Sequence, residues 1–558
     1  MYRYTYENLQ KAAKTEAGKA FLERMEKEYK ETYEGIPIPV LNYAYQKLYY
    51  QTGNRKLHET IHFDRRKRLK YLQILAIKSD AYLDELENIM AAICDEFSWV
   101  LPAHCYVEWE KPSFVYNRID LFAAETAMYL AETVYVMGNK LSTDIQNRVK
   151  ISLKQKIVDI FENNTCAVDY ATNNWASVVG CGIGLSYIYL FPERFGFVKD
   201  RILKGMDAYL SGIDDEGYCS EGIAYWQYGF GFYAVFYDVY TQLFGDAEIL
   251  KTEKVQNLLN APVRSEMAND VYLPYADGGC RQFFIHEQIY YTVKNLFGSD
   301  FLFVPSELST INSEKALGYR VLYALANATG GEQTSKESNF VYFKNAQVFL
   351  CKKDKYAFTT KGGNNDEMHN HNDLGAFQIV ANGKRVIVDI GSGEYTKPYF
   401  NDMIARYGDG IFVCGSQSHA VPIIDGKYQI CGKEIKAEVL NVSEEKIALD
   451  ISQAYGKERG QVCVEYACEE NGVRVKYTCK SLKDGATFRF VADEDCKPME
   501  VNGKAVIENV TVENAQGVKP EISNRIYSNH QAQPTTAYIV DYSFKGENVQ
   551  TEFFFSVN

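Results

Sequence analysis

Long apolar runs and a secretory leader are both missing from this sequence. No stretch of the 558 residues approaches the apolar length needed to cross a bilayer, so we expect no membrane partner. The first residues, MYRYTYENLQKAAKTEAGKAFLERM, have neither the apolar core nor the small-residue cleavage site of a signal peptide. We therefore expect a cytoplasmic protein, although a secreted protein whose leader had been removed would begin in the same way.

An excess of positive charge is also missing. The 60 Lys and Arg residues are outnumbered by 73 Asp and Glu, which gives a net charge of −13 and argues against a nucleic-acid partner. An anionic substrate stays open, because an acidic protein can carry a local basic cleft. The 39 glycines and 13 prolines are too few for a disordered or fibrous protein. The 13 cysteines are odd in number and scattered, which indicates reduced thiols.

Tyrosine is abundant, at 43 residues. Packing in cores and interfaces explains most of them, but tyrosine rings also stack on sugars, so the composition suits a carbohydrate cleft without proving one. A chain of this length is too long for a single hydrophobic core, so at least two domains are expected. The sequence leaves open whether copies associate into a homo-oligomer.

The first part of the chain has the apolar spacing of amphipathic helices. Short connectors with Gly, Pro and Asp separate the segments, a pattern typical of paired antiparallel helices that can close into a toroid. The predicted helical segments are 66–96, 119–137, 144–162, 173–193, 222–244 and 285–297.

The pattern changes near residue 330, after which short β-rich runs alternate with turns. The polar segment 327–339 is a plausible linker. The turn ANGK (381–384) places Asn-Gly between two apolar runs, which is a strong hairpin signal. We predict a multidomain α + β protein, with an N-terminal (α/α) toroid over 1–330 and an antiparallel β-sandwich over 331–558.

Two of only eight histidines lie within three residues, at His369 and His371. Two imidazoles this close are costly to bury unless each has a partner, which favours a functional site. Together with Asp389 and His419, His371 could supply three ligands to Zn²⁺. The structural alternative is that the histidines are satisfied polar residues and that Asp389 only begins a turn.

At these residues the sequence resembles the heparinase II/III-like polysaccharide lyases. The matching pieces are HNHNDLGAFQIVANGKRVIVDIGSGEY (369–395), SHAVPIIDG (418–426), NNWASVVGCGIG (173–184) and EGIAYWQYGFGFY (221–233). They follow the family's order and fall on both predicted domains. The family's fold is a helical toroid followed by an antiparallel β-sandwich, in agreement with the periodicity.

The resemblance implies roles for several residues. His371, Asp389 and His419 match zinc ligands that are usually described as structural, and His369 matches a histidine that faces the substrate. Asn174 matches a residue that neutralises the uronate carboxylate, although capping of a helix by an Asn here is the structural alternative. Some relatives carry Asn-His at this place, whereas this chain has Asn174-Trp175, which casts doubt on a histidine base from this segment.

Tyr225 matches the catalytic tyrosine, which acts as base, acid or both, and Tyr228 is a close rival on the same helix face. The alternative is an aromatic packing stripe. Further candidates for substrate contact are less specific, and helix-end packing explains Trp99 and His104 equally well. These candidates are Asn173, Trp175, Tyr228, Glu221, Trp99, His104, Arg406 and Tyr399. Asp277 is interpreted as a turn residue, with a site role left open, and Tyr395 and Tyr407 are further candidates.

The function that follows is cleavage of an anionic, uronate-containing poly- or oligosaccharide by β-elimination. An alginate or oligoalginate lyase would use the same layout. A glycoside hydrolase would instead need a pair of carboxylates, for which Asp215 and Glu221 are present but not marked as a pair. A non-catalytic glycan-binding protein of the same fold is the third alternative.

Overall fold

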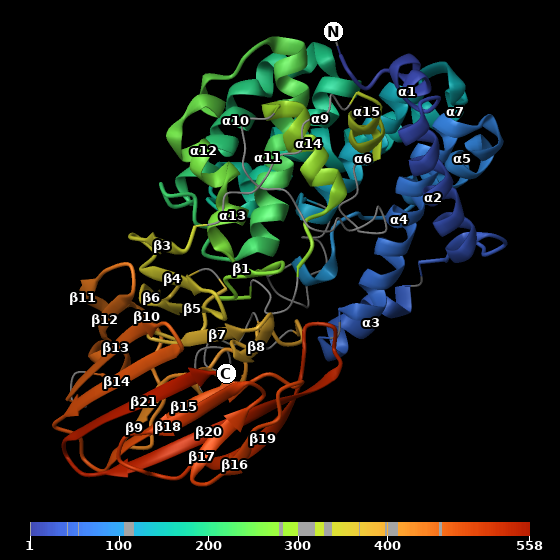
Figure 1. Cartoon of the computed structure of the whole chain (residues 1–558). Helices are drawn as coiled ribbons and strands as arrows, with labels where there is room; N and C mark the ends of the chain where they lie inside the picture. Colours follow the sequence, from blue (N-terminus) through green and yellow to red (C-terminus); the bar gives the residue numbers. More distant parts are fainter. Residues whose placement is uncertain are drawn as a thin grey trace. The chain divides into compact units, whose positions relative to one another are not determined.

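The computed structural model describes residues 2–558 except 42, 54, 105–116, 278–282, 299–317, 328–337, 368, 397–398, 400–410 and 457–459. The chain forms two compact units. The helical unit comprises Met1–Ile213, Tyr225–Gln256 and Phe284–Thr334. The sandwich unit comprises Asp214–Ala224, Asn257–Phe283 and Ser335–Asn558. The predicted fold class, helices followed by antiparallel sheets, is confirmed, but two segments from the first half of the chain belong with the second unit (Figure 1).

The α-helices occupy the blue-to-yellow part of the chain in Figure 1. They are α1 (Tyr6–Ala12), α2 (Glu16–Tyr33), α3 (Tyr43–Thr52), α4 (Lys56–Lys78), α5 (Leu83–Cys94), α6 (Leu121–Met137), α7 (Thr143–Leu153), α8 (Asp159–Asn163), α9 (Asn174–Leu190), α10 (Pro192–Ser211), α11 (Ile223–Phe244), α12 (Glu253–Leu259), α13 (Ala261–Ser265), α14 (Glu287–Phe297) and α15 (Gly318–Ala326). Among the described helices, none is both long enough and apolar enough to cross a bilayer.

The segment predicted as helical over 66–96 is divided into α4 and α5. The division falls at Ser79, whose backbone is extended and whose hydroxyl accepts a hydrogen bond from Ala81 N at 3.2 Å. A serine that satisfies a free backbone N–H in this way starts a new helix rather than continuing the old one. The segment predicted over 144–162 is continuous, but it passes through a π-helical stretch at Lys154–Val158.

The N-terminal segment is fixed inside the helical unit by a buried ion network. The Arg320 guanidinium, fully buried, lies 2.9 Å from Glu132 Oε1 and 3.7 Å from Asp238 Oδ2. The Tyr4 hydroxyl donates to Asp238, and the Arg320 guanidinium lies over the Tyr4 ring. Arg3 adds a second cation 2.8 Å from Asp238. The network therefore joins the start of the chain to α6, α11 and α15.

The sandwich unit consists of two large antiparallel sheets and the short pairs β1–β2 and β6–β10. One large sheet has the order β11-β12-β13-β14-β21-β18-β17-β16, and the other has the order β19-β20-β15-β8-β7-β5-β4-β3 with β9 paired to β15. The strands are β1 (Glu266–Ala268), β2 (Val271–Tyr272), β3 (Phe340–Phe343), β4 (Val348–Lys353), β5 (Tyr356–Lys361), β6 (Asn364–Asn365), β7 (Phe377–Ala381), β8 (Lys384–Ile387), β9 (Pro422–Ile424), β10 (Gly432–Lys436), β11 (Glu438–Val442), β12 (Lys446–Asp450), β13 (Gln461–Glu469), β14 (Gly472–Lys480), β15 (Gly485–Ala492), β16 (Met499–Val501), β17 (Lys504–Ile507), β18 (Val510–Asn514), β19 (Glu521–Ser528), β20 (Pro534–Lys545) and β21 (Val549–Val557).

The hairpin predicted at residues 381–384 is confirmed. Ala381 pairs with Lys384 across a two-residue turn, and both central residues have positive φ, 49° at Asn382 and 76° at Gly383. Asn-Gly tolerates this left-handed pair, which matches the twist of the flanking strands. The core between the two sheets is aromatic and aliphatic, with Phe377, Phe490 and Phe553 among its fully buried members.

A second apolar cluster explains why two early segments belong to the sandwich unit. Tyr218, Leu273 and Tyr275 pack against strand residues including Val348 and Leu350. Alternate residues of a strand point to opposite faces, so a sheet whose inner face meets the other sheet must cover its outer face with something else. Segments 214–224 and 257–283 provide part of that cover. Asp277 lies near the C-terminal end of the second segment.

The buried ion network in the helical unit generates a stability prediction. Replacing Arg320 with Met removes the cation shared by Glu132 and Asp238, and loss of one partner of a buried ion pair typically costs about 3–5 kcal/mol. Urea unfolding followed by circular dichroism should show this loss. The matched control, Arg148→Met, removes an exposed arginine that pairs with Asp95 and Asp144, and should cost no more than about 1 kcal/mol. Equal effects of the two substitutions would contradict the prediction.

Candidate functional site

The carboxylate of Asp277 is the centre of a polar cluster in the sandwich unit. Asp277 follows β2 and comes directly after Ala276, whose φ of 60° turns the chain. The side chain is completely buried. It accepts hydrogen bonds from His369 Nδ1 (2.6 Å), His371 Nε2 (3.1 Å), Tyr395 OH (3.0 Å) and Tyr399 OH (2.5 Å).

These donors determine the charge state of Asp277. Burial raises the pKa of the carboxyl group, but the hydrogen bonds and charges of His369 and His371 outweigh this and hold the pKa well below its ordinary value. Asp277 is therefore a carboxylate across the physiological pH range. An ionised carboxylate can only accept hydrogen bonds, so it orders both imidazoles with an N–H toward itself.

The loop that carries both histidines is fixed by its own polar side chains. Asn370 accepts from Glu367 N (3.3 Å) and donates to Asn372 Oδ1 (3.2 Å). The buried Lys361 ammonium lies 3.0 Å from Asp373 and 3.5 Å from Glu367, one at each end of the loop. His369 has a φ of 55°, a left-handed conformation that this network must hold.

Glu221 contributes a second carboxyl group beside His369. Its Oε1 lies 3.4 Å from His369 Nε2, and its side chain is almost fully buried. Burial raises the pKa of Glu221 above its ordinary value; the charge of His369 opposes this shift and that of Asp277 adds to it. Glu221, predicted as a substrate contact and named with Asp215 under the hydrolase alternative, is therefore a buried neighbour of His369.

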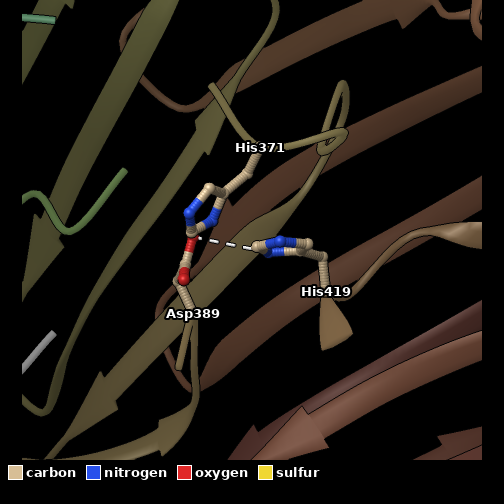
Figure 2. Close-up of side chains that lie close together, drawn as sticks. All are labelled: His371, Asp389 and His419. Atoms are coloured by element: carbon tan, nitrogen blue, oxygen red, sulfur yellow. Dashed lines mark ion pairs between the residues drawn. The ribbon is translucent and has the colours of Figure 1, made fainter. Parts of the chain in front are cut away.

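His371, Asp389 and His419 converge on one point, as the zinc interpretation predicts (Figure 2). Each offers a ligand atom, and these atoms all lie within 4.8 Å of one another. Among the described residues, none forms a hydrogen bond with His371 Nδ1, Asp389 Oδ2 or His419 Nδ1, which are all buried, and His419 Nδ1 lies 3.4 Å from Asp389 Oδ2 (Figure 2). Buried polar atoms normally have partners, so three such atoms facing one another are what a metal site requires.

The opposite atoms of the same side chains are all held. His371 Nε2 donates to Asp277, His419 Nε2 donates to Val413 O at 3.2 Å, and Asp389 Oδ1 accepts from Gly391 N at 2.8 Å. Such outer contacts orient metal-binding imidazoles and carboxylates. The residues present therefore fit a cation with nitrogen and oxygen ligands.

Tyr395 and Tyr399 lie beside the histidines. The Tyr395 ring is stacked on His369 with centroids 6.3 Å apart and planes inclined by 18°, and it contacts Tyr399 at 5.1 Å. Tyr399 is buried and hydrogen-bonded to Asp277, so it supports the site rather than presenting a surface for substrate. The candidates Arg406 and Tyr407 lie outside the described residues.

The helical unit holds the other predicted residues. Asn173 is the N-cap of α9, and its side chain accepts from Trp175 N at 3.2 Å, so the capping alternative describes this residue. Asn174 is the first residue of the helix and is buried. Trp175 is half-buried. The His104 ring lies edge-on to the Trp175 ring with centroids 5.1 Å apart, and the Arg118 guanidinium lies 5.9 Å from the centroid of the Trp175 ring.

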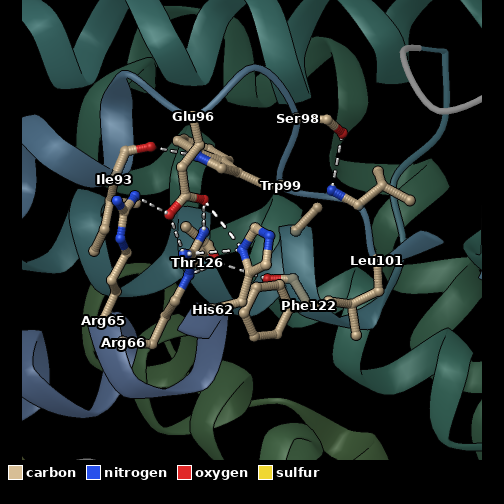
Figure 3. Close-up of polar contacts among 12 residues, drawn as sticks. His62, Arg65, Arg66, Ile93, Glu96, Ser98, Trp99, Leu101, Phe122 and Thr126 are labelled. Atoms are coloured by element: carbon tan, nitrogen blue, oxygen red, sulfur yellow. Dashed lines mark hydrogen bonds and ion pairs between the residues drawn. The ribbon is translucent and has the colours of Figure 1, made fainter. Parts of the chain in front are cut away.

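Trp99 does not form a binding surface in this structure. Its ring is 1% exposed and its indole N–H donates to Ile93 O at 2.9 Å, which supports the packing alternative. The same turn follows Glu96, a buried carboxylate bound by Arg66 and Arg65 and close to His62 (Figure 3). Burial raises the pKa of Glu96, but the charges and hydrogen bonds of Arg66 and His62 together outweigh this and lower the pKa.

His104 lies just beyond that turn, and its side chain is partly exposed. Its Nδ1 donates to Asp120 Oδ2 at 2.6 Å, and Asp120 also caps α6 through Ala123 N. The carboxylate therefore orients the imidazole toward Trp175. His104, Trp175 and Arg118 together form a mixed aromatic and cationic cluster, which suits an acidic sugar.

Tyr225 and Tyr228 are both half-buried on α11. The Tyr228 hydroxyl donates to Glu125, so this tyrosine already has a carboxylate acceptor within the helical unit.

Two residues were missed or undervalued by the sequence interpretation. Asp277, interpreted as a turn residue, receives four hydrogen bonds from residues that the structure describes. A weak signal was present, since an acidic residue before Gly-Gly that ends an apolar run, LPYADGG, is an unusual place to bury a charge. Arg118 was not considered, and only its distance to Trp175 reveals it.

Comparisons with known proteins give similarity in structure but not in sequence. No family model and no curated protein matches the chain. A crystal structure of heparinase III matches with a TM-score of 0.60 and 13% identity, over 96% of this chain and 92% of that one. A heparan sulfate lyase HepC mutant from Pedobacter heparinus gives 0.57 and 10%, over 99% and 89%.

A third match extends the range of proteins with this layout. The chondroitin AC lyase of Streptomyces coelicolor A3, solved with chondroitin sulphate, gives a TM-score of 0.55 and 10% identity, over 99% of this chain and 82% of that one. All three are below the identity at which function can be transferred, but they match almost the whole chain. The protein therefore has the fold of the heparinase-like polysaccharide lyases, a helical region followed by antiparallel sheets.

Proposed function

We propose that the protein is a polysaccharide lyase that cleaves an anionic, uronate-containing glycan by β-elimination. The observation that carries the proposal is the position of His369, which is held by the buried Asp277 carboxylate beside a set of candidate metal ligands. The fold around it is similar to that of a heparan sulfate lyase and a chondroitin AC lyase. The fold alone would not suffice, since one fold serves many functions. An alginate or oligoalginate substrate is an alternative within the same chemistry.

Elimination from a uronate removes the proton at C5 and expels the oxygen at C4. The C5 proton is weakly acidic because its loss places further negative charge next to a carboxylate. The protein must neutralise that carboxylate, supply a base and protonate the leaving oxygen. We assign the neutralising role to Asn174 and the proton transfers to Tyr225 and His369.

His369 is prepared for such a role by its two carboxyl neighbours. Asp277 keeps a proton on Nδ1, so Nε2 is the ring nitrogen whose protonation can change during the reaction. A free tyrosine side chain has a pKa near 10, so a base role for Tyr225 requires stabilisation of the phenolate or a concerted transfer. Tyr228, Trp175 and His104 are proposed as substrate contacts of the helical unit.

We further propose that His371, Asp389 and His419 hold a structural Zn²⁺. Bound there, the ion would supply cross-links between the histidine loop, the end of β8 and the turn before β9. It would thereby fix the loop on which His369 lies. A cytoplasmic location and the oligomeric state stay predictions that only experiments on the purified protein and on cells can test.

A panel of glycans tests the proposed reaction. The protein should produce ultraviolet absorbance from a C4–C5 unsaturated sugar with at least one of heparan sulfate, chondroitin sulfate, hyaluronan and alginate, because elimination leaves a conjugated double bond. The His369→Ala variant serves as the inactive control. Saturated products alone would indicate a hydrolase, and binding without products would indicate a glycan-binding protein; either result would overturn the proposal.

The Asp277 carboxylate should be required for catalysis. Asp277→Asn keeps the shape but removes the charge and one set of acceptor lone pairs, so His369 and His371 lose their orientation. Loss of such a supporting partner typically costs about 10–100-fold in activity or metal affinity. The measurement is kcat/KM on the best glycan of the panel, with Asp354→Asn in the exposed turn before β5 as the matched control. Unchanged activity of Asp277→Asn would contradict the role.

The metal proposal is tested by elemental analysis. Wild-type protein should contain about one zinc per chain, since one tetrahedral site needs these three ligands and a fourth. His371→Ala should lose the metal and unfold at a lower temperature, whereas the control His286→Ala in the helical unit should keep both. Wild-type protein purified with zinc present but free of metal would refute the site.

A further inference from the structure

The turn between β19 and β20 lies directly beside the candidate site. Asn529 forms a β-bridge with Gly393, two residues before Tyr395. Glu394 N donates to Ser528 O at 3.2 Å, and Ser528 Oγ donates to Glu394 Oε2 at 3.0 Å. The turn is therefore joined to the segment that carries Tyr395, although more than a hundred residues separate them in the chain.

Asn529 also gives the turn a defined shape. Its Oδ1 accepts from Gln531 N and Gln533 N, both at 3.0 Å, and its Nδ2 donates to Thr535 Oγ1 at 2.9 Å. An Asn side chain that binds successive backbone N–H groups stabilises a tight turn. The residue that this turn presents, His530, is thus held in place rather than carried on a loose end.

His530 continues a row of rings that begins at His369. The His530 ring meets the Tyr395 ring edge to face, with centroids 4.4 Å apart and planes at 90°. Tyr395 is stacked in turn on His369. Exposure rises along the row, because the His369 side chain is 17% exposed, Tyr395 is half-buried and His530 is exposed.

We propose that His530 is a glycan-binding residue of the candidate site, and that its imidazole donates a hydrogen bond to an anionic oxygen of the sugar next to the one held at His369. The proposal rests on the proposed function and deepens it, since it names the chemical group recognised beside the reacting sugar. The anionic oxygen belongs to a uronate carboxylate or to a sulfate, which share the same acceptor chemistry.

The chemistry of the neighbouring groups supports a donor here. The carboxylates of this cluster, Asp277 and Glu221, are buried, and Asp277 is fully engaged by hydrogen-bond donors. At its exposed end the row presents tyrosine and histidine rings, and the nearby Glu394 carboxylate accepts a hydrogen bond from Ser528 Oγ. An imidazole N–H is a good donor to carboxylate or sulfate oxygen, and charge-assisted hydrogen bonds of this kind are the stronger ones.

The alternative is that His530 only positions Tyr395 through the ring contact, and three substitutions separate the two roles. His530→Phe keeps a ring against Tyr395 but has no N–H, His530→Gln keeps an N–H donor without the ring, and His530→Ala has neither. If His530 binds glycan, Phe and Ala should both raise KM about fivefold to tenfold with little change in kcat, as expected for one lost hydrogen bond, and Gln should recover part of the loss. If His530 only positions Tyr395, Phe should behave as wild type, which would overturn the proposal.

The binding step is also measured without turnover. The His530 substitutions are made in the His369→Ala background and titrated calorimetrically with sulfated and desulfated hexasaccharides of the best substrate. The affinities of these variants should follow the same order as their KM values. A His530→Phe effect confined to sulfated chains assigns the oxygen to sulfate, and an equal effect on both assigns it to the carboxylate. Equal affinity of His530→Phe and its parent for both chains overturns the proposal. Absence of any unsaturated product with the wild type would instead reject the proposed function, so the two failures are distinguishable.

Discussion

One buried carboxylate holds the candidate site together. Taking an ionised group out of water costs several kcal/mol, and Asp277 offsets this with two imidazole and two phenol donors. Hydrogen bonds to a charged group contribute about 1.5–3 kcal/mol each, so the set of four can make the burial favourable. The consequence is geometric, because the same carboxylate fixes the ring of His369 and the ring of His371 at once.

This shared acceptor connects two kinds of chemistry. His371 uses one nitrogen for Asp277 and turns the other toward Asp389 and His419, while His369 uses one nitrogen for Asp277 and presents the other toward Glu221. The proposed metal and the proposed proton transfer therefore depend on the same side chain. Asp277 and the short loop between the histidines connect the two rings.

The sandwich supports this arrangement by recruiting chain from outside its own sequence region. Segment 257–283 covers part of the outer face of the large sheet, and its apolar residues Leu273 and Tyr275 precede Asp277. Packing of those residues brings the carboxylate to the histidine loop. The turn after β19 also contributes to the site, because it places the His530 ring against the Tyr395 ring. Residues from three distant parts of the chain thus meet in a single unit.

The sequence by itself determined the elements and part of the site. Apolar spacing predicted α6, α9, α11 and α14 closely, and Asn-Gly at 382–383 determined the hairpin, because these signals are local. The structure brings the predicted set His371, Asp389 and His419 together, and their role as zinc ligands stays a prediction. Only the tertiary structure decided the burial of Trp99 and the role of Asp277, whereas the break at Ser79 rests on a local cap that the apolar spacing did not register. Asp277 meets its partners across 92 to 122 residues, and contacts over such separations depend on packing, which no local pattern records.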